Sequence, residues 1–519
     1  MFTLSASTHI RHSRLQGTMF SISVSVVIFF LTQVVALAAS GQIAMPPASD
    51  KPVIKWQSLM FKTYKGDSIP YQFGMLRVPE NRLRAGTRFL ELAVLKLSRK
   101  VGAGPFKDSA QASSGPILFL SGGPGQSGID YIKEEYFQKF IFQLQEHNDI
   151  ILLDQRGTGR SKPSLGYPIV PGDNRNIFAS PQRMIQMTDD AATAGYAAFK
   201  KSSIDISGYN TVQSADDLYD LKSALGVDKL SLLAISYGTH LAIATAKKHP
   251  EIISKMINIG TSGLNHMHHL PSTYDSQLKR VSDLAAGDSA ILRQVPDMID
   301  LLKRVLKKLE VHPVPLRIKD FRQQKMITVP VGKFGLQFIL RLDAGDSYDF
   351  VYFPAMLYGI DQGDFRLLQQ YAERRYNQFN GASGSGIFAM RQASGASPAR
   401  YQQIKQEGKT ALLGNSMNTP DIYAGWKNVD LGDDYREAFN CNIPTLFISG
   451  TLDSNTPIKN VEEIIKDFSK AAHVIVENAG HEDMLPNEDV HAAMVKFFTS
   501  DEVGVRTITL PIPKFVPVY

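Results

Sequence analysis

The chain has 519 residues, of which 43% are hydrophobic and 20% are charged, and its formal net charge is +6. This length exceeds one ordinary domain, so we expect a large core with a sizeable insertion, or two domains. The composition excludes a disordered or fibrous chain. Basic residues are interspersed with acidic ones, and the densest basic stretch, 303–308, fits the solvated face of a helix, so no nucleic-acid partner is expected.

The chain contains a single cysteine, Cys441. One thiol excludes an intramolecular disulfide and a zinc site built on cysteines. No cysteine follows the apolar N-terminal segment, so a bacterial lipid anchor is excluded as well. We therefore expect the hydrophobic core to supply the stability of the fold.

The N-terminus has the outline of a signal peptide. Basic residues at 11–14 precede an apolar run over 19–37, and small residues follow where a signal peptidase would cut. Cleavage would remove segment 1–40 and leave an exported protein, periplasmic or extracellular, without stable membrane association. The alternative is an uncleaved membrane anchor, because the run approaches the length that spans a bilayer.

The chain that follows predicts an α/β fold. Alternating residues over 57–97 indicate antiparallel strands, and the Gly-, Ser- and Lys-rich stretch 98–114 indicates a surface loop. Short apolar runs then alternate with helical patterns, which is typical of a mostly parallel sheet with right-handed crossovers. The runs are 116–120, 150–153, 230–235 and 256–259, and the helices are 213–225, ended by Gly226, and 239–248.

This rhythm breaks at Gly263. From there to residue 441 the sequence reads as amphipathic helices and loops, for instance 297–309 and 364–379, with no run of alternating buried strands. We expect a mainly helical lid, 263–441, inserted between two parts of the core, 52–262 and 442–519. The second part resumes with strand 444–448, helix 458–468, strand 473–476 and helix 488–498.

A candidate nucleophile lies in Ala234-Ile235-Ser236-Tyr237-Gly238, between a buried strand and a helix. That context is the one required of a nucleophile elbow, where small neighbours permit a sharp turn. Ala234 replaces the usual first glycine but is still small. Taken alone, the pentapeptide also fits an ordinary turn serine.

Two further strand ends supply partners for this serine. A serine hydroxyl needs a base within hydrogen-bond reach, itself held by a carboxylate. Asp453 follows strand 445–448 and His481 follows strand 474–476, so both belong at the sheet edge where ligands gather. The chain order Ser236, Asp453, His481 is that of α/β-hydrolases. We therefore predict a triad with Ser236 as nucleophile, His481 as general base and Asp453 as the orienting acid.

The loop Ser121-Gly122-Gly123-Pro124-Gly125 follows strand 117–120 and is a candidate oxyanion hole. Acyl transfer places negative charge on the former carbonyl oxygen, and glycines let backbone N–H groups approach it closely. We assign one donor to Gly123 and the other to the N–H of Tyr237. A phosphate-binding loop is disfavoured because no Gly-Lys-Ser/Thr follows.

These motifs, together with Asp154-Gln155-Arg156-Gly157-Thr158-Gly159-Arg160-Ser161, resemble the proline iminopeptidase and tripeptidyl aminopeptidase family of α/β-hydrolases. The resemblance covers roughly 57–260 and 442–500, and the lid is unmatched. It implies an α/β-hydrolase fold and a serine exopeptidase that acts on small peptides from a free amino terminus, without cofactor or metal. It also implies that Asp154 and Arg156 are structural.

Relatives in that family hold the substrate ammonium with lid carboxylates. No motif selects among the candidates here, so none enters the predicted site; they are Asp343, Asp346, Asp349, Asp361 and Asp364. A histidine cluster, His266, His268 and His269, has spacing that could suit a metal, but no carboxylate partner is evident and a loop or lid-hinge role is favoured.

Three hypotheses for function follow. The first is a secreted aminopeptidase of the prolyl or tripeptidyl type. The second is an esterase or lipase, because the fold and triad do not fix the leaving group. The third is a catalytically silent binding protein, which the full set of triad and oxyanion residues disfavours. Oligomeric state is left open.

Overall fold

The computed structural model describes residues 52–100, 115–169, 172–381, 383–416 and 423–518, which belong to one compact unit. The predicted signal segment 1–40 lies outside the described residues, as does most of the expected loop at 98–114. Within the described ranges, no helix combines the length and the apolar character needed to cross a bilayer.

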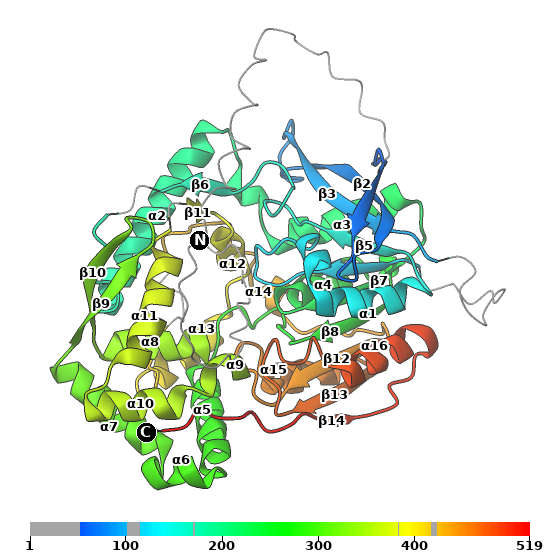
Figure 1. The fold of residues 1–519 in the computed structure, drawn as a ribbon. Helices are drawn as coiled ribbons and strands as arrows, with labels where there is room; N and C mark the ends of the chain where they lie inside the picture. Colours follow the sequence, from blue (N-terminus) through cyan, green and yellow to red (C-terminus); the bar gives the residue numbers. More distant parts are fainter. Residues whose placement is uncertain (1–51, 101–114, 170–171, 382, 417–422, 519) are drawn as a thin grey trace. The chain divides into compact units, whose positions relative to one another are not determined.

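A large sheet organises the described residues (Figure 1), with strand order β1-β2-β3-β5-β4-β7-β8-β12-β13-β14. Every pair from β5 to β14 is parallel, whereas β1, β2, β3 and β5 pair antiparallel. The predicted α/β fold with a mostly parallel sheet is thereby confirmed. The strands are Gln57–Lys62, Ser68–Pro79, Phe89–Leu97, Ile150–Leu153, Ile117–Leu120, Leu230–Ile235, Ile253–Ile259, Thr445–Gly450, Ala471–Glu477 and Thr507–Thr509 in that order.

Two hydrophobic clusters cover the two faces of this sheet. Successive side chains of a strand point to opposite faces, so Ile117 and Phe119 of β4 join one cluster and Leu118 and Leu120 join the other. The first cluster lies under α1 and α16, which lie together in Figure 1. The second lies under α3 and α4 and continues into the inserted segment. These helices are α1 (Glu135–Gln145), α16 (Glu488–Ser500), α3 (Thr211–Leu225) and α4 (Tyr237–Lys248).

Local sequence signals set the ends of α3, the helix before the candidate nucleophile strand. The Asn210 side chain accepts a hydrogen bond of 3.0 Å from the N–H of Gln213, which caps the start of the helix. Gly226 ends the helix at φ 67° in the left-handed region that favours glycine. Strand β7, which leads to the candidate nucleophile, begins four residues later.

The segment from Gly263 to Cys441 is mostly helical, but it also contains a β-hairpin. The expectation of no alternating strands was wrong here, because β9 (Val314–Asp320) and β10 (Lys325–Val331) pair antiparallel. Leu316 and Ile318 are buried between exposed neighbours, the alternation of a half-buried strand. The helices are α5 (Pro271–Ala286), α6 (Ser289–Gln294), α7 (Met298–Val311), α8 (Lys333–Asp343), α9 (Ser347–Phe350), α10 (Phe353–Gln362), α11 (Arg366–Phe379), α12 (Phe388–Ser394), α13 (Pro398–Glu407) and α14 (Asp433–Arg436).

A part of the chain that precedes the nucleophile strand also packs with this segment. Strand β6 (Gly166–Pro168) pairs with β11 (Ser383–Ser385), and the ring of Tyr167 contacts that of Trp426. Helix α2 (Pro181–Lys201) lies so close to Trp426 that a Cβ on Gly195 would be 2.4 Å from its ring. Residues that precede the nucleophile strand therefore pack against the inserted segment 263–441.

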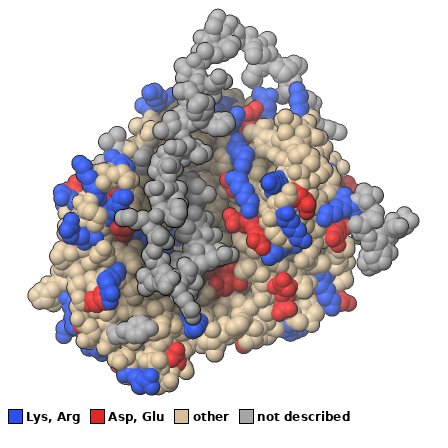
Figure 2. Space-filling model, in the orientation of Figure 1, with Lys and Arg blue, Asp and Glu red and all other residues tan. Residues whose placement is uncertain are grey.

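Charged side chains of both signs are mixed over the described part of the face drawn in Figure 2.

Candidate active site

Ser236 lies at the turn between β7 and α4 with φ 52° and ψ −122°, a strained conformation for a residue with a side chain. Its N–H donates to the carbonyl of Ile259 at 3.0 Å. A Cβ on Gly238 would lie 2.0 Å from the carbonyl oxygen of Leu120, so only glycine fits there. This is the geometry of a nucleophile elbow, in which strand, serine and helix meet at one point.

His481 and Asp453 are in direct contact. The Nδ1 atom of His481 lies 2.8 Å from Oδ2 of Asp453, whose side chain is fully buried, whereas that of His481 is 16% exposed. A hydrogen bond at Nδ1 fixes the ring orientation and leaves Nε2 as the nitrogen that can exchange a proton. The pair thus has the relationship required of an acid and a base in a triad.

The electrostatics of this pair favour its charged form. Burial lowers the pKa of His481, but the charge and hydrogen bond of Asp453 outweigh burial, and the pKa is raised to about 9. Burial raises the pKa of Asp453, but the charge of His481 and the hydrogen bonds to the carboxylate hold it below its ordinary value. Asp453 is therefore ionised at neutral pH and stabilises the imidazolium that proton transfer would create.

Thr456 contacts both Asp453 and His481, and the sequence reasoning missed it. Its hydroxyl donates to Asp453 Oδ2 at 2.5 Å and lies 3.0 Å from His481 Nδ1. Its N–H and that of Asn455 both donate to Asp453 Oδ1 at 2.8 Å. The turn after Asp453 therefore holds the carboxylate in one orientation, and the sequence signal for it is a threonine three residues after the acid.

Gly260 connects the histidine loop to the nucleophile. It follows Ile259, which accepts the Ser236 N–H, and a Cβ on it would lie 3.0 Å from His481 Cε1 and 2.7 Å from Thr456 Oγ1. All of the predicted triad residues therefore surround the carboxyl end of β8. The sheet edge brings them together from distant parts of the sequence, as its topology requires.

The predicted oxyanion loop lies against the nucleophile. A Cβ on Gly122 would be 3.0 Å from the Cβ and 3.5 Å from the Oγ of Ser236, so a side chain here would crowd the hydroxyl. Gly123 and Gly125 both have φ of 112°, which side chains rarely allow. The loop thus runs directly beside Ser236, as a loop that supplies backbone N–H groups to an oxyanion must.

Asp154 holds the residues that follow the oxyanion loop in place through hydrogen bonds. Its buried carboxylate accepts hydrogen bonds from the Ser127 hydroxyl at 2.6 Å, the Ile129 N–H at 3.0 Å and the Arg160 N–H at 2.8 Å. A Cβ on Gly159 would lie 2.2 Å from the carboxylate, so the chain wraps closely around it. These contacts give Asp154 a positioning role without contact to the candidate triad.

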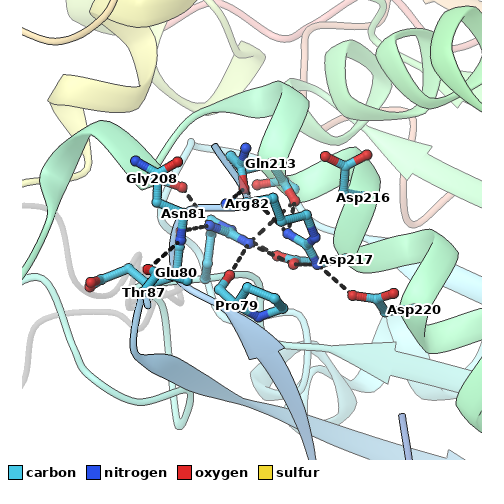
Figure 3. A network of polar contacts seen from close by, with 12 residues as sticks. Pro79, Glu80, Asn81, Arg82, Thr87, Gly208, Gln213, Asp216, Asp217 and Asp220 are labelled. Carbon is cyan, nitrogen blue, oxygen red and sulfur yellow. Dashed lines mark hydrogen bonds and ion pairs between the residues drawn. The ribbon is translucent and has the colours of Figure 1, made fainter. Parts of the chain in front are cut away.

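Arg156 joins three segments beneath the site. Its fully buried guanidinium forms two hydrogen bonds, 2.6 and 2.7 Å long, with the Asp217 carboxylate on α3 and donates to the carbonyl of Glu80 at 2.8 Å. Arg82 also contacts Asp217, at 2.8 Å (Figure 3). The network ties the turn after β2 to α3, so it fixes the scaffold under the nucleophile.

The lid is attached to the histidine loop. The N–H of His481 donates to the carbonyl of Gly345 at 2.8 Å, and the Ser347 hydroxyl donates to Asp483 at 2.7 Å. Asp346, between them, accepts a hydrogen bond from the N–H of Glu482. Burial raises the pKa of Asp346 well above its usual range, and its proximity raises that of His481.

Of the lid carboxylates considered from sequence, Asp346 is the one whose charge acts on His481. The others form ion pairs within the lid: Asp343 with Arg374 and Arg375, Asp349 with Arg374, Asp361 with Lys308 and Arg304, and Asp364 with Arg366. Their negative charge is therefore neutralised by neighbouring cations.

The histidine cluster forms no metal site among the described residues. His266 Nε2 lies 2.8 Å from the carboxylate of Glu463, which Arg400 also contacts at 3.2 Å. This carboxylate partner was not visible in sequence. Burial lowers the pKa of His266, and lowers those of His268 and His269 well below their usual range.

A comparison of the sequence with family models identifies the family of the chain. The family model described as alpha/beta hydrolase fold matches residues 115–488, which is more than half of the chain and contains the nucleophile elbow, Asp453 and His481. The chain therefore belongs to the alpha/beta hydrolase fold family, and we describe it as a hydrolase of that fold.

Relatives named as peptidases match parts of the chain. The serine protease Hip1 of Mycobacterium tuberculosis is 31% identical over 156 residues, 28% of this chain and 28% of that protein. The tripeptidyl aminopeptidase of Streptomyces coelicolor is 26% identical over 200 residues, 36% of this chain and 34% of that protein. The chain thus matches only about a third of these relatives' length.

Solved structures are similar at lower identity. A proline iminopeptidase-related protein of Thermus thermophilus is 15% identical, and the alignment covers 82% of this chain and 97% of that chain with a TM-score of 0.33. An esterase of Thermogutta terrifontis is 16% identical, with coverage of 81% and 97% and the same TM-score of 0.33. TM-scores this low support no conclusion about function.

Proposed function

We propose that the protein is an exported serine aminopeptidase of the prolyl or tripeptidyl type, which releases one or a few residues from the free amino terminus of a small peptide. The observation that carries this proposal is the contact of His481 with Asp453 and Thr456 beside the Ser236 elbow. The names of the Hip1 and tripeptidyl aminopeptidase relatives favour a peptide bond as the target.

In the proposed reaction, Ser236 Oγ attacks the scissile carbonyl carbon while its proton passes to His481 Nε2. The backbone N–H groups of Gly123 and Tyr237 stabilise the oxyanion. His481 then protonates the leaving amine, which breaks the peptide bond and leaves an acyl-enzyme. A water molecule, deprotonated by His481, hydrolyses the ester and regenerates the Ser236 hydroxyl. The residues named supply every proton transfer, so the proposal includes no cofactor and no metal.

The test compares a chromogenic alanyl or prolyl peptide amide with the same compound acetylated at its amino terminus. An aminopeptidase cleaves only the free form. Cleavage of neither amide, or of both equally, would exclude exopeptidase action, and activity on acyl esters would then favour an esterase. Ser236→Ala should reduce turnover on the order of 10³-fold or more, and Asp453→Asn should lower turnover with KM largely unchanged.

A matched control separates chemistry from folding. Ser223 lies on α3, where its hydroxyl bonds to the carbonyl of Tyr219, away from the candidate triad. Ser223→Ala should retain full turnover and full labelling by a fluorophosphonate, whereas Ser236→Ala should lose both. Loss of labelling in both variants would indicate that folding, and not the nucleophile, had changed.

The proposal also includes export of the protein and removal of its N-terminal segment. We infer that segment 1–40 is removed and that the mature enzyme acts on small peptides without nucleic-acid or stable membrane association. N-terminal sequencing of the protein recovered outside the cytoplasm tests this: a start near Gly41 supports cleavage, and an intact N-terminus in the membrane fraction supports the anchor.

A further inference from the structure

Two arginines of the inserted segment, one buried and one partly buried, lack the carboxylate partners that such cations normally have. Arg341, on α8, is 6% exposed, and within the described residues it has no hydrogen bond or ion pair; its Cζ lies 4.0 Å from the ring centre of Tyr274. Arg391, on α12, donates from Nη2 to the carbonyl of Met267 at 2.7 Å, but its buried Nε has no partner. The buried hydroxyl of Tyr274 also has none.

Other buried arginines show the contrast. Arg156, Arg400 and Arg436 each form an ion pair with a carboxylate. Burying a charge without a partner costs free energy. An ion pair with hydrogen bonds offsets much of that cost. The chain therefore places two guanidinium groups where, among the described residues, no carboxylate neutralises them.

The surroundings of the pair are positive. Burial lowers the pKa of Arg341, and the charge of Arg391 lowers it further. Both guanidinium groups also lower the pKa of His269. The carboxylate whose charge reaches Arg341 is Asp453, which already forms the ion pair with His481. Among the described residues, the region thus has an excess of positive charge that a bound anion would compensate.

The helix that carries Arg391 touches the nucleophile side of the site. On α12, the sulfur of Met390 accepts a hydrogen bond of 2.8 Å from the hydroxyl of Tyr237, the residue after the candidate nucleophile. Ile387, which caps α12, would lie 3.2 Å from a Cβ on Gly125 in the oxyanion loop. Arg391 is therefore about one turn or less from residues that contact Tyr237 and the oxyanion loop.

The elements that carry Arg341 and Tyr274 touch the acid and histidine side. Helix α8 leads into Gly345, whose carbonyl accepts the His481 N–H. Gln277, about one turn after Tyr274 on α5, donates to the carbonyls of Ala344 and Leu452, the latter adjacent to Asp453. The elements that carry the two arginines consequently contact the candidate triad region on its two sides.

We propose that Arg341 and Arg391, with the hydroxyl of Tyr274, bind a carboxylate of the substrate, so that the enzyme prefers peptides that are acidic or that end in a free carboxylate close to the scissile bond. Guanidinium groups bind carboxylates through paired N–H donors, and stacking on Tyr274 leaves the donor edge of Arg341 free for this. The substrate class named here rests on the proposed peptidase function.

The test uses free-amino-terminal peptides in matched pairs: glutamate against glutamine at one position, and a C-terminal carboxylate against its amide. For at least one pair, wild type should cleave the carboxylate member with a kcat/KM roughly 10-fold to 100-fold higher than the neutral member. This ratio corresponds to the free energy of a hydrogen bond to a charged group. The preferred pair distinguishes a side-chain from a terminal carboxylate. Arg341→Gln and Arg391→Gln should abolish the preference, because kcat/KM for the carboxylate member falls to that of the neutral member.

Two controls keep the outcome interpretable. Arg304→Gln, on an exposed lid arginine, should retain the preference. Because removal of an unpaired buried charge relieves a cost, Arg341→Gln should keep or raise the melting temperature. A large fall in melting temperature with equal loss for both members of each pair would show a structural role and overturn the proposal, as would a wild-type enzyme without preference.

A binding measurement distinguishes failure of the proposed peptidase function from failure of the proposed carboxylate site. Glutarate should protect Ser236 from a fluorophosphonate in wild type and fail to protect it in the Arg341→Gln, Arg391→Gln double variant. If no peptide is cleaved but this protection is seen, the peptidase proposal fails and the carboxylate site stands. If glutarate protects neither or both proteins, the carboxylate site is excluded whatever the enzyme cleaves.

Discussion

The hydroxyl of Thr456 donates a 2.5 Å hydrogen bond to the same carboxylate oxygen of Asp453 that His481 contacts at 2.8 Å. The turn that follows Asp453 thus fixes the carboxylate, which in turn orients His481. A carboxylate fixed in this way needs no reorientation when the imidazolium forms, which is the preorganisation that lowers barriers in enzymes.

Thr456→Val should weaken catalysis through Asp453. Loss of the hydrogen bond raises the pKa of Asp453 and frees its carboxylate, so we expect kcat to fall on the order of 10-fold, the value of one hydrogen bond to a charged group. Steady-state kinetics on the preferred substrate checks this. Thr456→Ser keeps the hydroxyl and should remain near wild type; equal rates for the valine and serine variants would contradict the positioning role.

The activity should rise with pH into the alkaline range. His481 must be neutral to accept the Ser236 proton, and its pKa is raised to about 9, so kcat/KM should increase up to that region. Asp346 contributes to the raised pKa, and Asp346→Asn should move the acid limb to lower pH. Asp364→Asn, on an exposed lid carboxylate paired with Arg366, should leave the profile in place. An unshifted limb in Asp346→Asn would mean that this carboxyl carries no charge in the working range.

Gly122→Ala should damage catalysis more than folding. The added Cβ would lie 3.0 Å from the Ser236 Cβ, so the nucleophile must shift by a few tenths of an ångström, while the backbone at Gly122 needs no positive φ. Small displacements of reacting groups cost up to about 100-fold in rate. We expect a reduction in kcat and in fluorophosphonate labelling with little change in melting temperature. Gly172→Ala, where the Cβ meets nothing within 4 Å, is the matched control.

Arg156→Ala should destabilise the fold. It leaves the buried Asp217 with only Arg82 as a cationic partner and removes donors from buried carbonyls, so we expect the free energy of unfolding to fall by about 3–5 kcal/mol. Urea unfolding of the variant measures this directly. Arg175→Ala breaks an exposed pair with Asp173 and should leave the midpoint where it is. Similar midpoints for both variants would show that the buried network adds little.

The parallel sheet could be predicted because its strands are short apolar runs with distinct ends. Leu230 to Ile235 and Thr445 to Ile448 are buried on both faces, which gives them a composition that surface elements lack. Ser236, Asp453 and His481 each follow such a run, and parallel strands end at one edge. Strand ends alone therefore suffice to expect these three residues near one another.

Other features depend on tertiary contacts that leave little trace in sequence. The hairpin from Val314 to Val331 alternates visibly, but it is short, and part of its support comes from α11, where Glu373 accepts the N–H of Lys319 at 2.6 Å. Arg341 and Arg391 lie on separate helices with no motif between them. Their relationship exists only once the lid has folded, whereas Thr456 could have been found by its spacing from Asp453.

The hydrogen bond from His481 to the carbonyl of Gly345 bears on how this enzyme could be re-engineered. A chimera that exchanged the whole lid for that of a related hydrolase would remove the acceptor beneath its own histidine. The stretch Gly345 to Ser347 is therefore best inherited with the core, and grafts should join on either side of it, in α8 and after α9.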